Sequence, residues 1–325
     1  MALIESALRE AIGVDPAEMH AAMRYVMGWE DEFGSPATAK GKRIRPALCL
    51  FASEAAGGAA SDAIAGAVAV ELVHNFSLVH DEVQDHDAER HHRPTLWARL
   101  GEGQAINTGD ALYAAAIRAL TRPGNDAVRS FQALDVLMRA VERMIAGQWQ
   151  DISFESRLDV SIEEYTAMSA GKTGALLGAP LQMGALLAGG DAATAAAFGR
   201  WGENVGLAFQ AQDDYLGIWG DPASTGKSNT NDIARKKKTL PIVWGLLDAD
   251  CAPTVRRVYA LADPGPGDIA TVVAALDRAE AGQVCRSAAH RHADAAEAEL
   301  AGMTIANATR AQFRAIADYM VDRSF

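Results

Sequence analysis

The chain contains few aromatic residues, few cysteines and no C-x-x-C spacing. Aromatic side chains make up only 6% of the 325 residues, whereas apolar residues make up 49%, and many of those are alanine. This composition favours closely packed helices over strands. The scattered positions of Cys49, Cys251 and Cys285 argue against a disulfide framework and a cysteine zinc site. We therefore expect an all-α protein in a reducing compartment, the cytoplasm.

The sequence also lacks a basic surface and a targeting segment. Its formal net charge is −12 and its pI is about 5.1, which argues against a nucleic acid partner or an anionic membrane, because both require a broad basic face. The N-terminal stretch has no basic start followed by an apolar core, and no run approaches the roughly 20 apolar residues that span a bilayer. We expect no membrane span.

Long proline-free stretches rich in Ala, Leu and Val predict helices. We expect these helices at residues 61–84, 126–150, 191–219 and 274–301. Gly, Pro, Asn, Asp and Ser cluster in short breaks at 34–41, 57–61, 122–125, 189–191, 220–230 and 263–267. Because none of these breaks resembles a linker, we predict a single domain over residues 1–325.

Acidic residues cluster twice within otherwise apolar helices. In LVHDEVQD, Asp81 and Asp85 are four residues apart, so their side chains point the same way and repel each other. A divalent cation between them is the simplest explanation. In QAQDDYLGIWGD, Asp213 and Asp214 lie near the end of another helix. Such carboxylates can hold Mg²⁺ ions that also bind phosphate, although solvated helix ends would give the same pattern.

Basic residues form three groups that can bind anions. The loop GKRIRP places Lys42, Arg43 and Arg45 before an apolar helix, where they can bind a diphosphate through charge-assisted hydrogen bonds. Arg90 to Arg93 follow the first acidic cluster, and Lys227 precedes the basic run 235–238. Each group by itself is equally compatible with an ordinary solvated turn or face.

In combination, these motifs resemble the trans-isoprenyl diphosphate synthases, the polyprenyl synthetase family. The matching motifs, in chain order, are GKRIRP at Gly41, His74, DExxD at Asp81, RPT at Arg93, GD at Gly109, GQxxD at Gly147, KTG at Lys172, QxxDD at Gln210, GDPxxxGK at Gly220 and KKTLP at Lys237. Each is weak alone, but their common order over most of the chain is specific. The resemblance implies an isoprenoid-synthase-type helical bundle around a central cavity, usually in a homodimer.

The resemblance also implies a role for each matching residue. About three Mg²⁺ ions would lie between the acidic clusters, held by Asp81, Asp85 and Asp213, with Asp214 supporting through water. The residues implied for the allylic diphosphate are Arg90, Lys172, Thr173, Gln210, Lys227 and Lys237. Those implied for isopentenyl diphosphate are Lys42, Arg45 and His74, with His91 where the family usually has an arginine.

The implied reaction is a prenyl transfer. The allylic diphosphate (dimethylallyl, geranyl or farnesyl) dissociates to a carbocation, which the double bond of isopentenyl diphosphate attacks before a proton is lost. Mg²⁺ and the cationic side chains stabilise the charge on the departing diphosphate, so Asp81, Asp85, Arg90, Lys172, Asp213 and Lys227 are the expected catalytic residues.

Three positions depart from the family pattern. Glu82 replaces an aspartate in the first acidic motif, and Gly217 replaces the last aspartate of the second. His91 removes a permanent charge, because histidine is mostly neutral at pH 7. We expect His91 to be protonated beside the diphosphate, or His92 and Arg93 to compensate for it.

Product length is expected to depend on Phe76 and Ser77. Phe76 lies five residues before Asp81, about 7.5 Å along a helix, where a ring can cap the growing chain. In the family, an aromatic residue here followed by a small one suggests geranylgeranyl diphosphate as product. Farnesyl diphosphate is a close alternative, and periodicity alone is equally compatible with Phe76 as ordinary core.

Other classes of function explain fewer of the motifs. A class I terpene cyclase needs an Asn/Asp, Ser/Thr and Glu triad, and Arg235 stands where Asn231 and Asp232 would need the Ser or Thr. A metal phosphohydrolase built on His80 and Asp81 would leave GKRIRP and KTG unexplained. A catalytically silent synthase subunit stays open because of His91 and Gly217.

Overall fold

The computed structural model describes residues 2–13, 17–37, 41–90, 93–221 and 231–321, and these are overwhelmingly helical. The all-α prediction is confirmed. In chain order the helical elements are α1 (Ala2–Ile12), α2 (Glu18–Val26), α3 (Ile44–Ala55), η1 (Ala60–Ala63), α4 (Ile64–Gln84), α5 (Leu96–Leu100), α6 (Glu102–Leu120), α7 (Ala127–Phe154), α8 (Ile162–Ser169), η2 (Ala170–Gly174), α9 (Ala175–Leu187), α10 (Ala192–Trp219), α12 (Asn231–Ala234), α13 (Leu240–Leu247), α14 (Ala252–Tyr259), α15 (Pro266–Arg278), α16 (Ala281–Leu300) and α17 (Asn307–Val321). Strands β1 (Glu89–Arg90) and β2 (Arg93–Pro94) pair antiparallel.

The helices form two compact units. Unit 1 comprises Met1–Val141 and Ala179–Gly199, and unit 2 comprises Glu142–Gly178 and Arg200–Phe325. Helices α7, α9 and α10 contribute residues to both units. The single domain over residues 1–325 stays a prediction.

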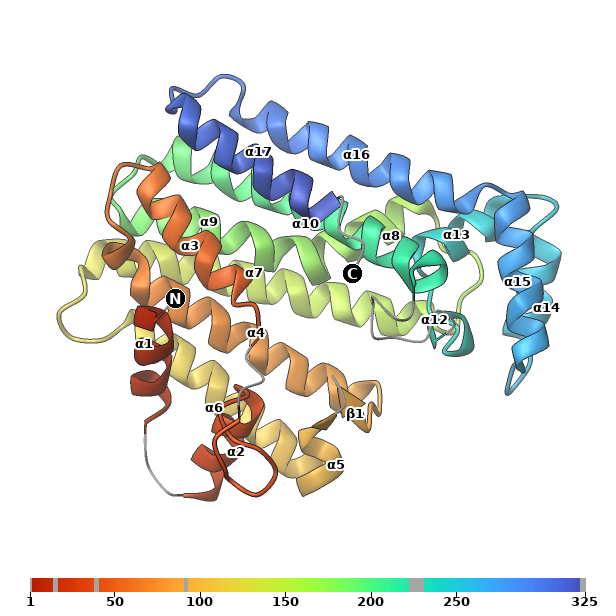
Figure 1. Ribbon diagram of the computed structural model, residues 1–325, viewed down its shortest axis with the longest axis horizontal. Coiled ribbons are helices and arrows are strands. Elements are labelled where there is room, and N and C mark those ends of the chain that lie inside the picture. Colours follow the sequence, from red (N-terminus) through yellow and green to blue (C-terminus); the bar gives the residue numbers. More distant parts are fainter. Residues whose placement is uncertain (1, 14–16, 38–40, 91–92, 222–230, 322–325) are drawn as a thin grey trace. The chain divides into compact units, whose positions relative to one another are not determined.

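Helix α4 is the central element of unit 1. It packs against α6, α3 and α1, and almost every residue from Gly66 to Val73 is fully buried (Figure 1). The approach to α6 is especially close at Gly109, where an added Cβ would lie 2.4 Å from the His80 ring. The GD motif therefore leaves room for a histidine beside the first acidic cluster.

One segment of the described chain, Ala60–Gln84, is long and apolar enough to cross a bilayer. The expectation that no run approaches this length was therefore too strict. However, 67% of that window is buried inside the protein, as expected of the core helix of a globular fold, and the segment carries Glu71 and Asp81.

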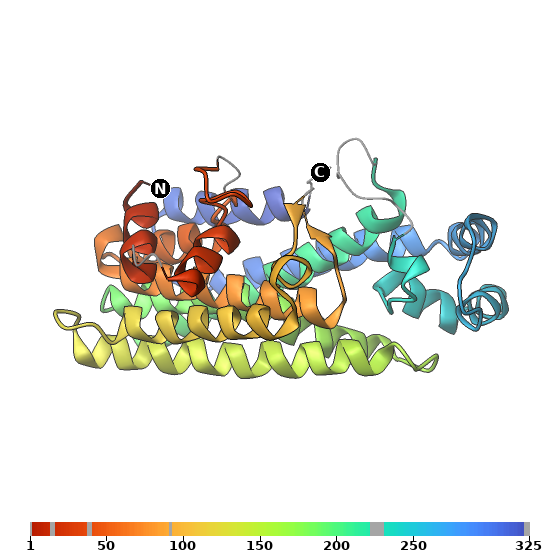
Figure 2. The same cartoon turned by 90° about the horizontal axis from the view of Figure 1, so that it is seen from below.

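In unit 2, α13 packs against α16, α14 and α8, and α16 packs against α17 (Figure 1). The rings of Trp201 and Phe313 meet edge to face at 4.8 Å between centroids, and both side chains are fully buried. Helices α14 and α15 lie side by side and are seen end-on in Figure 2. These contacts bury the apolar faces of helices far apart in the sequence.

The predicted helix over 274–301 is wrong in one respect. The chain forms two helices there, α15 and α16, and Glu280 between them has a left-handed φ of 55°. Gly282, the glycine nearest this break, lies inside α16 rather than at the break, and no proline marks the boundary, so the alanine-rich pattern favoured a continuous helix. The other three predicted helices correspond to η1 with α4, to α7 and to α10.

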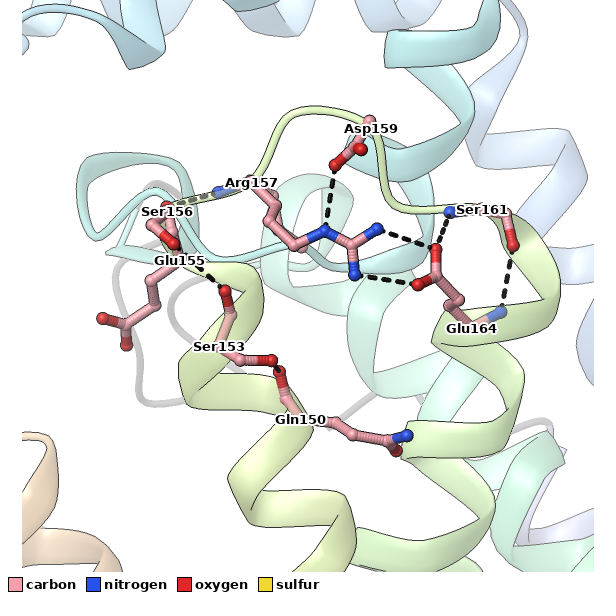
Figure 3. Close-up of polar contacts among 9 residues, drawn as sticks. Gln150, Ser153, Glu155, Ser156, Arg157, Asp159, Ser161 and Glu164 are labelled. Atoms are coloured by element: carbon pink, nitrogen blue, oxygen red, sulfur yellow. Dashed lines mark hydrogen bonds and ion pairs between the residues drawn. The ribbon is translucent and has the colours of Figure 1, made fainter.

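An arginine fixes the connection between α7 and α8 (Figure 3). The Arg157 guanidinium donates to Asp159 at 2.9 Å and to both carboxylate oxygens of Glu164 at 2.8 and 3.2 Å. Glu164 also accepts from the Ser161 backbone N–H, while the Ser161 hydroxyl accepts from the Glu164 N–H, which is a capping box. This network sets where α8 begins, and α8 leads directly into the KTG motif.

Candidate active site

The first acidic cluster lies at the C-terminal end of α4. Asp85 is the C-cap residue, and its backbone N–H donates to the Asp81 carbonyl at 2.8 Å, so the predicted one-turn spacing is confirmed. Both side chains are half-buried. The C-terminal end of a helix carries partial negative charge, so two carboxylates there are unfavourable unless a cation is present. Oxygen ligands of this kind fit Mg²⁺.

Glu82, the unusual residue of this motif, faces a different direction. Its side chain is largely buried and lies 3.6 Å from the Arg90 guanidinium. Burial raises the pKa of Glu82 to about 7, while Arg90 opposes that rise. Glu82 thus holds Arg90, a predicted diphosphate ligand, rather than extending the row of Asp81 and Asp85.

The GKRIRP loop is anchored by Arg43, a basic residue of the motif whose structural role the sequence did not reveal. Arg43 has a left-handed φ of 51° at the N-cap of α3, and its guanidinium is buried. It donates to Glu5 at 2.9 Å, to Glu71 at 2.7 Å and to the Met27 carbonyl at 3.0 Å. The two carboxylates compensate the buried charge. Arg43 thereby fixes the loop between the predicted ligands Lys42 and Arg45.

Arg45 and His74 have the electrostatic properties of an anion site. The Nε atom of Arg45 is buried without a hydrogen-bond partner among the described residues, and burial lowers its pKa. Burial, and then the charges of Arg45, Arg90 and Arg43, lower the pKa of His74 well below its usual value. His74 is therefore neutral and can donate one N–H. An anion would relieve both the unpaired nitrogen and the repulsion among these cations.

The RPT motif has a structural role. Arg93 stacks on the Tyr25 ring at 4.4 Å from its centroid and donates to the Glu30 carbonyl at 2.9 Å. The Thr95 hydroxyl donates to the Asp87 carbonyl at 2.6 Å. Because Arg93 is committed to these contacts, it is poorly placed to compensate for His91. His91 and His92 lie outside the described residues.

In unit 2, the KTG motif forms a π-helical turn, η2, of a kind that often marks functional sites. Lys172 Nζ donates to Asp151 at 2.5 Å, and the Thr173 hydroxyl donates to Gln210 Oε1 at 2.8 Å. The structure therefore brings three predicted ligands, Lys172, Thr173 and Gln210, into one described cluster. Asp151 is a member that the sequence analysis did not assign, although the GQxxD motif contains it.

Glycines allow the backbones to approach at this cluster. A Cβ on Gly147 would lie 2.3 Å from the Lys172 backbone nitrogen, and one on Gly206 would lie 2.7 Å from the Gly174 Cα. No side chain fits at these distances without moving a backbone. The glycines of the GQxxD and KTG motifs therefore place Lys172 beside α7.

Asp213 and Asp214 are adjacent but have different environments. Asp214 is only 4% exposed, and its oxygens accept from the Tyr165 hydroxyl at 2.6 Å, the Leu240 backbone N–H at 2.7 Å and the Gln210 amide at 2.8 Å. Burial raises its pKa to about 7, whereas these donors lower it. Asp214 thus orients Gln210 through a direct hydrogen bond, and its expected support of a metal ion through water stays a prediction. Asp213 is half-buried.

The lysines of KKTLP are also distinguished by their contacts. Lys238 is buried, donates to the carbonyls of Glu155 and Lys236 at 3.0 and 2.9 Å, and lies over the Tyr259 ring. Burial lowers its pKa to about 8. Lys237, the predicted ligand, is half-buried and its carbonyl accepts from Tyr259. Lys227 lies outside the described residues.

The absence of an aspartate at position 217 is explained by a neighbouring residue. A Cβ on Gly217 would lie 2.7 Å from Oδ2 of Asp232, a residue of α12. An aspartate side chain at position 217 would therefore lie directly against the carboxylate of Asp232. Gly217 follows Asp213 by one helical turn, so Asp232 adds negative charge near the second acidic cluster.

We predict that restoring the family residue will not improve this protein. In Gly217→Asp, the new side chain would displace and repel Asp232, lowering the free energy of unfolding by about 1–3 kcal/mol and leaving Mg²⁺ affinity no higher. Gly267→Asp is a matched control, because a Cβ there meets nothing within 4 Å. Thermal unfolding and Mg²⁺ titration would measure both effects, and Gly217→Asp/Asp232→Asn should recover the stability. A tighter Mg²⁺ site in the single variant would contradict this account.

Within the described ranges, no group of three or more His, Cys, Asp and Glu side chains is arranged as a metal site. The carboxylates of Asp81, Asp85 and Asp213 are nevertheless of the right chemical type, because Mg²⁺ is usually bound by one or two carboxylates together with substrate phosphates and water. The residues present therefore fit Mg²⁺ bound with a diphosphate.

Comparison with known proteins agrees with these motifs. The family described as polyprenyl synthetase matches residues 31–276. The (2E,6E)-farnesyl diphosphate synthase of Mycobacterium bovis is 40% identical over 99% of this chain and 90% of its own, and the geranylgeranyl diphosphate synthase of Mycobacterium tuberculosis is 42% identical over 85% and 79%. The crystal structure of a polyprenyl synthetase from Streptomyces coelicolor A3(2) has a TM-score of 0.93 and 38% identity, covering 98% of this chain and 97% of that one.

Proposed function

Because this chain belongs to the polyprenyl synthetase family and is a Mg²⁺-dependent short-chain prenyltransferase, we propose specific roles for its described residues. Asp81, Asp85 and Asp213 hold Mg²⁺, about three ions in all. Arg90, Lys172, Thr173, Gln210 and Lys237 bind the allylic diphosphate. The observation that supports this proposal most is the pair of hydrogen-bonded groups at the KTG motif, Lys172 with Asp151 and Thr173 with Gln210 and Asp214, because these contacts would orient the proposed diphosphate ligands.

The proposed reaction joins isopentenyl diphosphate to an allylic diphosphate. Mg²⁺, when bound, supplies Lewis-acid stabilisation of the departing diphosphate. Arg90 and Lys172 add fixed positive charge to the same leaving group, which is electrostatic rather than covalent catalysis. Lys42, Arg45 and neutral His74 orient isopentenyl diphosphate. Two ligands proposed from family resemblance, His91 and Lys227, complete the set but lie outside the described residues.

For the product, we propose geranylgeranyl diphosphate, with farnesyl diphosphate as the alternative. Relatives bearing both names are similar to this chain, at 42% and 40% identity. The pair of Phe76 and Ser77 supports the longer product by family resemblance.

We further propose a homodimer, in which α7 contributes to the interface. Several large apolar side chains on α7 are exposed, including Phe131 at 72% and Trp149 at 77%. Val128, Ile145 and Ile152 continue this stripe at helical spacing. Large exposed apolar side chains along one side of a helix are unfavourable in water, which supports a protein partner on this side of α7. The cytoplasmic location also stays a prediction.

The proposed function is tested by direct assay. The purified protein is incubated with labelled isopentenyl diphosphate, Mg²⁺ and each of dimethylallyl, geranyl and farnesyl diphosphate, and the products are separated by chromatography. We expect elongated diphosphates ending at 20 carbons. A final 15-carbon product would favour the farnesyl alternative. No incorporation by folded protein would instead favour the silent-subunit hypothesis.

A further inference from the structure

A carboxylate on α1 contacts the GKRIRP loop. One oxygen of Glu5 accepts from Arg43 Nε at 2.9 Å, and the other accepts from the Trp29 indole N–H at 2.8 Å. Arg43 and Trp29 are buried, with 5% and 2% of their surface exposed. Glu5 precedes residue 31, where the match to the polyprenyl synthetase family begins, so that match assigns Glu5 no role.

Glu5 is held in a defined position on α1. Ile4 and Leu8 of the same helix are fully buried, which fixes α1 on the core of unit 1. Arg9, one turn after Glu5, places its guanidinium over the Trp29 ring, 4.5 Å from the centroid. The indole of Trp29 therefore contacts α1 twice, through its N–H and through its face. The Glu5 carboxylate is thus oriented by α1 and Trp29 together.

Arg43 depends on its side-chain contacts to keep the loop in shape. Its φ of 51° is in the left-handed region, which is unfavourable for a residue with a Cβ. The guanidinium donates to Glu5 of α1, to Glu71 of α4 and to the carbonyl of Met27, the C-cap residue of α2. Removing Glu5 would leave a buried donor without its acceptor. It would also weaken the hold on the loop that carries two proposed isopentenyl diphosphate ligands.

Glu71 links this contact to the other proposed ligands of isopentenyl diphosphate. It is 4% exposed and lies one helical turn before His74 on α4. Burial lowers the pKa of Arg45, and the Glu71 carboxylate opposes that shift. Glu71 is therefore shared between Arg43 and Arg45. Because Glu5 supplies a second carboxylate to Arg43, Glu71 stays available to Arg45.

We propose that Glu5 is a positioning residue for isopentenyl diphosphate, acting through Arg43 on the GKRIRP loop. This inference rests on the proposed function, in which Lys42 and Arg45 of that loop bind this substrate. The proposed ligands of the allylic diphosphate lie on other segments of the chain. Loss of Glu5 should therefore weaken the binding of one substrate selectively. At saturation the bound diphosphate itself holds the loop, so turnover should change little.

The test is the steady-state kinetics of Glu5→Ala, with each substrate varied in turn while the other is saturating. We expect the KM for isopentenyl diphosphate to rise by about tenfold, because one charged hydrogen bond is lost. The KM for the allylic diphosphate and the turnover should stay close to the wild type. Glu10→Ala is the matched control, since Glu10 is an exposed residue of the same helix that accepts from Arg122 at 2.8 Å. Glu5→Gln, which keeps an acceptor oxygen without the charge, should raise the KM less than Glu5→Ala.

A second measurement does not depend on turnover. Isopentenyl diphosphate alone, without an allylic partner, is titrated into each variant in a calorimeter. Glu5→Ala should bind it more weakly than the wild type or Glu10→Ala. Because Glu5 acts through Arg43, Glu5→Ala/Arg43→Gln should bind it no more weakly than Arg43→Gln. If Glu5→Ala is unfolded by circular dichroism, Glu5→Gln provides the same comparisons.

Three results would overturn the inference. The first is an unchanged affinity for isopentenyl diphosphate in the folded Glu5 variant. The second is an equal loss of affinity for both substrates, which indicates general destabilisation. The third is additive losses in the double variant, which would mean that Glu5 does not act through Arg43. A wild type that binds isopentenyl diphosphate but forms no product would overturn the proposed function alone, and the calorimetric comparison would still decide the role of Glu5.

Discussion

Replacing Asp81 with asparagine should lower the turnover of prenyl transfer by about 10²–10³-fold while leaving the fold intact. Asp81 lies at the negatively polarised end of α4, one turn from Asp85, and is half-buried. Asparagine keeps the shape but removes the charge that attracts Mg²⁺. The loss should appear mainly in turnover, because Asp81 would hold an ion whose positive charge favours departure of the diphosphate.

The measurement is the initial rate of labelled isopentenyl diphosphate incorporation over a range of Mg²⁺ concentrations. Glu54→Gln is the matched control, since it removes one exposed carboxylate from α3 in the same unit and should leave the rate unchanged. Part of the activity of Asp81→Asn should return at high Mg²⁺. If the variant kept wild-type turnover at low Mg²⁺, the first acidic cluster would not be the metal site.

Replacing Asp214 with alanine should lower the free energy of unfolding by about 3 kcal/mol or more. The change leaves the Tyr165 hydroxyl, the Leu240 N–H and one N–H of the Gln210 amide without their acceptor in a buried site. Each unsatisfied buried donor costs about 1–3 kcal/mol. Gln210 would also lose its orientation toward Thr173, so activity should fall as well.

Asp213→Asn is the informative comparison, because it changes the neighbouring residue. We expect Asp213→Asn to reduce turnover strongly and to change the free energy of unfolding little. In Asp214→Ala, by contrast, the loss of stability should be the larger effect. Tyr165→Phe, which removes one of the three donors, should cost about 1 kcal/mol. Chemical denaturation and steady-state kinetics on the same samples separate the two effects. Equal stability losses in Asp213→Asn and Asp214→Ala would show that the two carboxylates share one structural role.

The helical class and the first acidic cluster follow from local sequence. Asp81 and Asp85 are on one helix, so the period of the helix alone determines that they point the same way. The long helices were predictable for the same reason, since each carries its own apolar pattern. The break at Glu280 was not, because the glycine nearest it, Gly282, lies two residues beyond the break and the stretch is otherwise rich in alanine, which favours a continuous helix.

Tertiary contacts decided which residues of each motif have a structural role and which are available to bind a ligand. Asp213 and Asp214 are equivalent in the sequence, but Asp214 accepts hydrogen bonds from Tyr165 and Leu240, residues 49 and 26 positions away. Lys237 and Lys238 also differ through a distant contact. Lys238 donates to the carbonyl of Glu155, which is 83 positions away in the sequence. Arg43 anchors the GKRIRP loop because its guanidinium donates to the carboxylates of Glu5 and Glu71.

By itself, then, the sequence determined the helical class, the family and the two acidic clusters, because these depend on residue types and spacings along one chain. Only the tertiary structure showed that Asp214 accepts a hydrogen bond from Gln210 and that Asp232 lies beside Gly217. Burial and hydrogen bonding join residues that are distant in the chain, and periodicity carries no information about such partners.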